Sequence, residues 1–265
     1  MVYEPGQEVF RSRFFSHIIE PEFRARVCDF CLDMKGDDNS TMRCSGCKFV
    51  YYCQKSCQKS AWRQNHHRKE CPVFAKMSSE FEKSPMKPVL KMSDLDNFIF
   101  HVVRIIVKLN NGGGEEFEIL PDGRKRTFHD LMSHREDIFK NDLTKNCFKV
   151  IYSIIKTCLK EKEVPEESYF QEIYGKIKVN AIGLERFFQN KFVDYATGLF
   201  LGASGIDHSW WVDFGLYHLL NWRQISFKKY LFAALSLKCI KNIFLITLVH
   251  LIVPGLTILW MVENW

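Results

Sequence analysis

The stretch that decides the fold runs from Cys28 to Cys71 and reads CDFCLDMKGDDNSTMRCSGCKFVYYCQKSCQKSAWRQNHHRKEC. Its candidate metal ligands fall into four pairs: Cys28-x2-Cys31, Cys44-x2-Cys47, Cys53-x3-Cys57 and His67-x3-Cys71. A C-x2-C turn presents two thiolates to one ion, and an x3 spacing on a helix places two ligands one turn apart on one face. Four pairs supply the eight ligands that two tetrahedral zinc ions require. We therefore expect two structural Zn²⁺ ions, because full protein coordination leaves no position for a substrate.

The spacing alone leaves open which pairs share an ion. Sequential pairing would group Cys28, Cys31, Cys44 and Cys47 on one ion and Cys53, Cys57, His67 and Cys71 on the other. Interleaved pairing would group Cys28, Cys31, Cys53 and Cys57, and Cys44, Cys47, His67 and Cys71. His66 competes with His67, but His67 lies four residues before Cys71, which is one helical turn. The histidine ligand is therefore expected to be His67.

Folding energetics also favour metal in this segment. A stretch this short cannot bury enough apolar surface to fold alone, whereas structural zinc contributes on the order of 10–16 kcal/mol in zinc-finger peptides. We expect Phe49, Tyr51, Tyr52 and Trp62 to pack as a small satellite core rather than to stack on a ligand.

Charge and cysteine usage narrow the class of protein. The net charge is +6, and residues 24–76 carry the whole excess, with eleven basic and five acidic residues. Such a patch is typical of a solvated surface, and weak nucleic-acid binding or an acidic partner is the alternative. The N-terminus is polar and lacks the apolar stretch of a signal peptide, so we expect reduced cysteines and an intracellular location, in the nucleus or cytoplasm.

The rest of the chain predicts an α+β fold. Residues 1–24 read as a turn and one or two strands, Pro72 is expected to end the last helix of the 28–71 segment, and 72–92 has a linker composition. Residues 93–170 are expected to be helical, with a packed helix over 95–109 that stops at the Asn-Asn-Gly-Gly-Gly breaker of 110–114, and two further helices in 127–160. Residues 171–209 are punctuated by glycine and read as strands and turns.

The composition changes abruptly after residue 210. Residues 243–262 are twenty residues long with His250 as their one ionisable side chain, which is long enough to cross a bilayer. Lysines and an arginine precede this segment, so insertion would give a tail-anchored chain with its N-terminal part in the cytosol. The alternatives are a buried core helix, or a tail at 210–265 that is not a native continuation of the domain.

The ligand pattern, together with Tyr52, Gln58 and Trp62, resembles a MYND finger. That resemblance implies interleaved, cross-brace zinc pairing. It also implies a module that docks short proline-containing peptides of partner proteins.

The flanking residues resemble the SET and MYND lysine methyltransferases. The similar segments are Pro5–Ser12, Val103–Leu109, Asp130–His134, Gly198–Ser204 and Asp207–Ser209. The resemblance covers about residues 5–209 and implies a finger inserted into a partial, helix-rich SET-like domain with a hydrophobic tail. It further implies that Asn180, Asp207 and His208 belong to an S-adenosylmethionine site, and that the substrate is a histone or another protein.

Several departures from that family affect the expected activity. The family's glycine-rich cofactor loop lies upstream of the Pro-Gly stretch, Trp210 stands where the family has a zinc-binding cysteine, and Cys239 is the one cysteine after it. Tyr217 and Tyr230 lie in a context unlike that of the family's late catalytic tyrosine. We expect a protein-interaction module that is inactive in this form. The alternatives are an S-adenosylmethionine-dependent lysine methyltransferase, and an incomplete or alternatively spliced version of a longer one.

Overall fold

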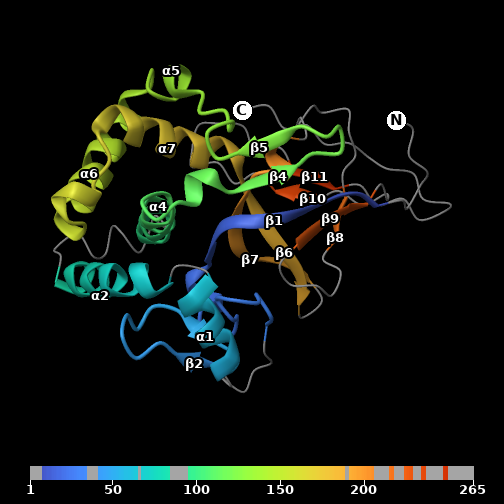
Figure 1. The fold of residues 1–265 in the computed structure, drawn as a ribbon, viewed down its shortest axis with the longest axis horizontal. Coiled ribbons are helices and arrows are strands. Elements are labelled where there is room, and N and C mark those ends of the chain that lie inside the picture. The colour runs from blue at the N-terminus through green and yellow to red at the C-terminus, as the bar shows by residue number, and fades with distance from the viewer. Residues whose placement is uncertain are drawn as a thin grey trace.

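The computed structural model describes residues 8–34, 41–64, 67–83, 95–188 and 191–205, and four short strands beyond them. Figure 1 shows three regions: helices α4 to α7 on one side, the sheets on the other, and the 28–71 segment with α1 and β2 below both. The fold mixes helices and antiparallel strands, as the sequence predicts. Figure 1 also shows α4 between α2 and the helices α6 and α7.

The main sheet brings together the beginning and the later part of the chain. Its strands lie in the order β6-β7-β1-β9-β8, and all neighbours pair antiparallel. They are β1 (Glu8–Ile19), β6 (Ala181–Phe188), β7 (Lys191–Phe200), β8 (Gly215–Tyr217) and β9 (Gln224–Lys228). The 28–71 segment and the α-helices that the structure describes therefore lie in one long insertion between β1 and β6.

The other strands that the structure describes form three two-stranded antiparallel sheets. They pair β2 (Met42–Arg43) with β3 (Tyr51–Tyr52), β4 (Phe117–Ile119) with β5 (Lys125–Thr127), and β10 (Ala234–Ser236) with β11 (Thr247–Val249).

Helix α4 (Leu95–Leu109) is the centre of the core, and its predicted bounds are confirmed. Residues 99–107 are buried all round the helix, because β1, α2 and the later helices pack against it. The helix ends where the sequence predicts, with Gly112 in the left-handed region at φ 90°. The remaining helices are α1 (Lys55–Gln64), α2 (His67–Lys83), α5 (Arg135–Ile138), α6 (Asp142–Cys158) and α7 (Glu167–Asn180), with short 3-10 turns at Pro21–Phe23, Gly113–Glu115, Glu161–Glu163 and Ala203–Gly205.

Pro72 does not end a helix, and the predicted linker is helical up to Lys83. Helix α2 passes through Pro72, whose missing N–H removes one hydrogen bond of the helix. Phe74 and Met77 follow one turn apart, and both are fully buried in the cluster that contains α4. We infer that this burial offsets the lost hydrogen bond and carries the helix onward.

Residues 171–180 are helical rather than extended, so the glycine at 175 misled the prediction. A Cβ atom at Gly175 would lie 2.3 Å from the Ser133 carbonyl oxygen, so glycine is needed there for α7 to approach the 133 turn. The helical signal was present in the spacing of Phe170, Ile173, Tyr174 and Ile177, all of which are buried.

The expected satellite core does not exist as a separate cluster. Phe49 stacks on Phe100 of α4 at 3.7 Å between ring centroids, and Phe74 of α2 packs edge-on against both rings. Tyr52 is fully buried in the same cluster, whereas Trp62 remains 43% exposed. The 28–71 segment therefore shares one core with the helices, and of the four aromatic residues expected in the satellite core, Trp62 is the exposed one.

Among the described residues, no helix is both long enough and apolar enough to cross a bilayer. The predicted membrane segment 243–262 lies outside the described residues except for strand β11.

Candidate metal centre

The eight predicted ligands form two compact groups. One contains Cys28, Cys31, Cys53 and Cys57, and the other contains Cys44, Cys47, His67 and Cys71. Within each group the ligand atoms lie within 4.8 Å of one another. The arrangement is interleaved, which excludes sequential pairing, and His67 takes the histidine position.

Two turns of the same design present the first pairs of ligands. Cys28 accepts a hydrogen bond on its carbonyl from Leu32 N–H at 2.8 Å, and Cys44 accepts one from Lys48 N–H at 3.0 Å. Leu32 and Lys48 each directly follow the second cysteine of a pair, and both have a positive φ, of 56° and 54°. The left-handed residue turns the chain back, so each pair of thiols points to the same side.

Cys53 directly follows β3, and the other three ligands come from α1 and α2. Cys57 lies in the first turn of α1, and His67 and Cys71 lie on successive turns of α2. Gly46 allows the second group to close, because a Cβ atom there would lie 2.8 Å from Cys71 Sγ. A side chain at position 46 would therefore push that ligand out of place.

The distances between ligand atoms match a tetrahedral zinc ion. Zn–S bonds of about 2.3 Å separate two sulfurs by about 3.8 Å at the tetrahedral angle. The Cys31–Cys53 and Cys44–Cys71 sulfurs lie 3.7 and 3.8 Å apart. His67 Nε2 lies 3.4 Å from Cys44 Sγ and 3.9 Å from Cys47 Sγ, around the value expected for mixed N and S ligands.

The proton chemistry of the thiols also fits a cation at each centre. Hydrogen bonding from Cys31 lowers the pKa of Cys28 to about 5. Burial and then the neighbouring thiol of Cys57 raise the pKa of Cys53 to about 12, and burial and then the Cys47 charge raise that of Cys71 to about 12. Four thiolates cannot be ionised together in so small a space without a positive ion, and Zn²⁺ supplies that charge.

Comparison with known proteins agrees with this geometry. Residues 28–71 match the sequence family described as MYND finger. The chain is 42% identical over 130 residues to the mouse histone-lysine N-methyltransferase SMYD3, covering 49% of this chain and 25% of that protein. The chain is thus similar to SET and MYND proteins over about half of its length.

Two further relatives extend the match. A SET and MYND domain-containing protein of Dictyostelium discoideum is 38% identical over 93 residues, which is 30% of this chain and 17% of that protein. The mouse histone-lysine N-methyltransferase Smyd1 is 23% identical over 203 residues, covering 77% of this chain and 36% of that protein. The chain therefore spans between about a sixth and about a third of the length of these curated relatives.

A buried ion network joins the MYND finger to α4. His67 Nδ1 lies 2.8 Å from Glu70 Oε1, which leaves Nε2 for the metal. Arg104 of α4 donates to both Glu70 oxygens at 2.9 Å. A carboxylate behind a zinc-bound histidine fixes the ring's tautomer and orientation, so Arg104 positions this ligand through Glu70.

The same guanidinium reaches the other zinc group. Arg104 donates to the Asp29 carboxylate at 2.9 and 3.1 Å and to the His17 carbonyl of β1 at 2.8 Å. Asp29 directly follows the ligand Cys28, and its N–H donates to the Tyr51 carbonyl at 2.7 Å. Burial raises the pKa of both Asp29 and Glu70, and the Arg104 charge reverses that effect and holds them ionised.

Sequence reasoning missed Asp29, Glu70, His17 and Arg104. Two signals could have found part of the network. Glu70 lies one turn after the histidine ligand, and Arg104 is the one lysine or arginine inside the apolar stretch Ile99–Val107.

The assignment of Asn180, Asp207 and His208 to an S-adenosylmethionine site remains a prediction. Asn180 is 3% exposed, and its Nδ2 donates to the Met132 and Lys176 carbonyls at 2.8 and 2.7 Å. Asp207 and His208 lie outside the described residues. The structure therefore assigns Asn180 a role in holding the 132 turn against α7.

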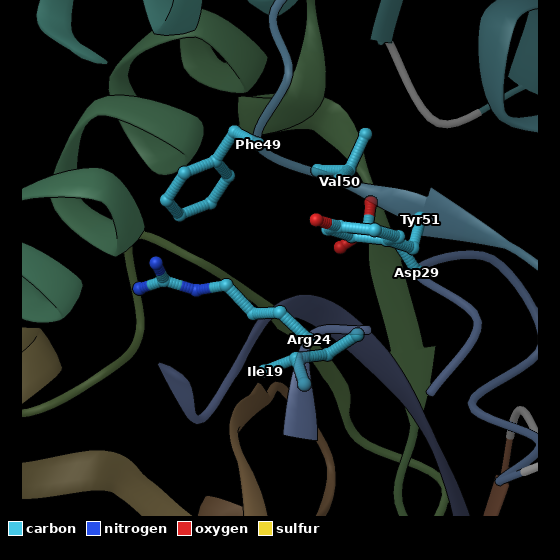
Figure 2. Close-up of a pocket in the computed structure, with 6 residues that line it drawn as sticks. All are labelled: Ile19, Arg24, Asp29, Phe49, Val50 and Tyr51. Atoms are coloured by element: carbon cyan, nitrogen blue, oxygen red, sulfur yellow. The ribbon is translucent and has the colours of Figure 1, made fainter. Parts of the chain in front are cut away.

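A small cavity lies beside the first zinc group, between the finger and the end of β1. Figure 2 shows the Arg24 guanidinium under the Phe49 ring, with Asp29, Val50 and Tyr51 across the cavity and Ile19 at its base. Its volume is about 10 Å³, which is the size of one water molecule. Arg24 Nε is buried without a hydrogen-bond partner among the described residues, and the cavity beside it is too small to be a ligand pocket.

Paired serine substitutions should read out the interleaved pairing directly. Cys28→Ser with Cys53→Ser removes ligands from one group, so the purified full chain should retain one zinc. Cys28→Ser with Cys44→Ser damages both groups and should retain none. Zinc per chain measured by mass spectrometry gives the answer, and the reversed outcome would mean sequential pairing.

Replacing Arg104 should cost far more than replacing an exposed arginine. Arg104→Met leaves Asp29 and Glu70 buried without a cation, which should lower the free energy of unfolding by about 3–5 kcal/mol. Arg135→Met breaks an exposed pair with Glu172 at 3.6 Å and should cost less than about 1 kcal/mol. Urea unfolding of the zinc-loaded chains measures both.

A triple variant separates the ion network from simple packing loss. Adding Asp29→Asn and Glu70→Gln to Arg104→Met removes the stranded charges, so part of the stability should return. Equal losses for the single and the triple variant would contradict the assignment.

Proposed function

We propose that this chain is a protein-interaction module whose MYND finger docks short, proline-containing peptides of partner proteins. The observation that carries the proposal is the exposure of Trp62. Phe49 and Tyr52 are buried in the shared core, whereas Trp62 keeps 43% of its surface in solvent. Tryptophan is costly to leave in water and is enriched among residues that dominate binding energy, so an exposed one on a rigid helix suits peptide docking.

Zinc binding holds Trp62 in place. Its ring packs edge-on against the ring of the ligand His67 at 5.9 Å between centroids. Gln58 lies one turn earlier on the same face of α1 and is partly exposed, so its amide can bond to a peptide backbone beside the indole. Both fully coordinated centres have structural roles in this proposal, since neither leaves an open position for a substrate.

Residues 8–23 and 181–205 with α4 to α7 are interpreted as the SET-like part of the chain. The support is the insertion of the finger between β1 and β6, together with the relatives' descriptions as SET and MYND proteins. A location inside the cell, in the nucleus or cytoplasm, is part of this proposal. It agrees with nine free thiols in the described residues.

Truncating Trp62 should abolish docking without disturbing the metal. A proline-containing peptide selected on the wild-type chain should bind Trp62→Ala at least about 30-fold more weakly, since removal of a central tryptophan typically costs 2 kcal/mol or more. Tyr169→Ala, which removes a 37% exposed aromatic residue on α7, is the matched control and should bind normally. Both variants should contain two zinc ions. Unchanged binding by Trp62→Ala would refute the docking site.

The second candidate function is transfer of a methyl group from S-adenosylmethionine to a protein lysine. It is favoured by the similarity to the two mouse relatives, which are named histone-lysine N-methyltransferases. Against it, the Asn180 amide already donates to two carbonyls, and Trp210 replaces the family's cysteine.

A methyltransferase assay distinguishes the two candidate functions. We expect the zinc-loaded chain to transfer no labelled methyl group to core histones above the background of a heat-denatured sample. Incorporation that disappears in an Asn180→Ala variant would overturn this expectation and support the enzyme.

A further inference from the structure

The exposed face of α1 carries more than Trp62. Cys57 and Ala61 face the core, and the opposite side of the helix presents Lys55, Lys59 and Arg63 on successive turns. At about 100° per residue, Trp62 falls on this same outward face. The candidate docking residue is therefore bordered by a stripe of three positive charges.

Two acidic side chains of the finger are buried in its interior. Asp29 and Glu70 are 6% and 2% exposed, and both are bound to Arg104. Within residues 28–34, 41–64 and 67–71, every exposed charged side chain is basic. These are Arg43, Lys48, Lys55, Lys59, Arg63, Arg68 and Lys69. Burial of Asp29 and Glu70 in the ion network thus contributes to the positive charge of the described finger surface.

The positive charges of the stripe on α1 are not neutralised by neighbouring acidic side chains among the described residues. Within the part of the chain that the structure describes, Lys55, Lys59 and Arg63 take part in no ion pair. Like charges four residues apart repel each other and disfavour the helix. The stripe therefore destabilises α1, and binding of an anionic partner would reduce this repulsion. Arg68 and Lys69, next to the ligand His67, extend the positive charge from α1 to the start of α2.

We propose that the partner segment is acidic: a peptide whose apolar, proline-containing centre packs on Trp62 and whose flanking Asp and Glu residues pair with the stripe. This rests on the proposed docking function and adds the chemistry of the partner. Lys55 to Arg63 spans about 12 Å of helix, which matches about four residues of extended peptide.

A short acidic peptide suits this surface better than a nucleic acid does. A duplex needs a positive field along many phosphates. Here the zinc-thiolate centres bring negative charge under the finger, a net −2 for four thiolates and −1 for three thiolates with histidine. Five of the seven exposed basic side chains lie on the stripe and at the start of α2, over a surface too small to follow a duplex.

The first test identifies the partner chemistry without assuming a sequence. A display library of peptides with a fixed proline and random flanks is selected on the full zinc-loaded chain at about 50 mM salt, where surface charges are weakly screened. Enrichment of Asp and Glu beside apolar residues supports the proposal. Enrichment of proline peptides without acidic flanks overturns it and leaves the docking function intact. If no peptide is enriched, both the acidic-partner proposal and the docking function are overturned.

The second test locates the charge effect. Lys55→Glu with Lys59→Glu should weaken binding of the selected acidic peptide about tenfold or more, and raised salt should shrink the difference. Lys145→Glu with Lys149→Glu, an exposed i,i+4 pair on α6, changes the net charge equally and should alter affinity less than about twofold. A Lys-flanked version of the peptide should bind the first variant better than wild type does.

Three results would overturn the proposal at this stage. Equal weakening by both double variants would mean a general charge effect. No weakening by either would mean that the stripe does not touch the peptide. Tighter binding of a 12-base-pair DNA duplex than of the peptide, lost in the Lys55→Glu and Lys59→Glu variant, would assign the stripe to nucleic acid.

Discussion

The guanidinium of Arg104 connects the three parts of the molecule. It holds a carboxylate beside each zinc group, Asp29 and Glu70, and it also bonds to the His17 carbonyl of β1. Burying one cation and two anions is expensive, and it is sustained only because every hydrogen bond in the set is made at once. Zinc coordination, the position of α4 and the position of the end of β1 therefore depend on one another. The finger is an integral part of the main fold rather than a separate module.

This dependence changes how the finger's stability is understood. A zinc finger with no core of its own obtains its folding free energy from metal binding. Here the finger also contributes Phe49 and Tyr52 to the cluster that contains Phe100 and Phe74. Metal binding and apolar burial thus support the same segment, and loss of either would loosen the contact between finger and helices.

The sequence predicted the ligands, the two metal centres and the helix at 95–109, because each depends on local spacing. Pairing between the zinc groups depends on which turns meet in space, and spacing left it open. The helix through Pro72 and the helix at 171–180 were missed because a proline and a glycine were interpreted locally. Burial of Phe74 and a close approach to Ser133 decide those positions. Arg104 is conspicuous in the sequence as an arginine within an apolar stretch. Its partners could not be predicted, because they are at least 34 residues away along the chain.

The pairing of Phe14 in β1 with Phe200 in β7 has a consequence for synthesis of the chain. At about 5–20 residues per second, roughly 10–40 seconds pass on the ribosome before the partner strand exists. During that interval β1 offers unpaired backbone groups and phenylalanine rings to any neighbouring strand. The finger can meanwhile capture its metal, so early zinc supply would shorten the time in which the nascent chain is open to aggregation.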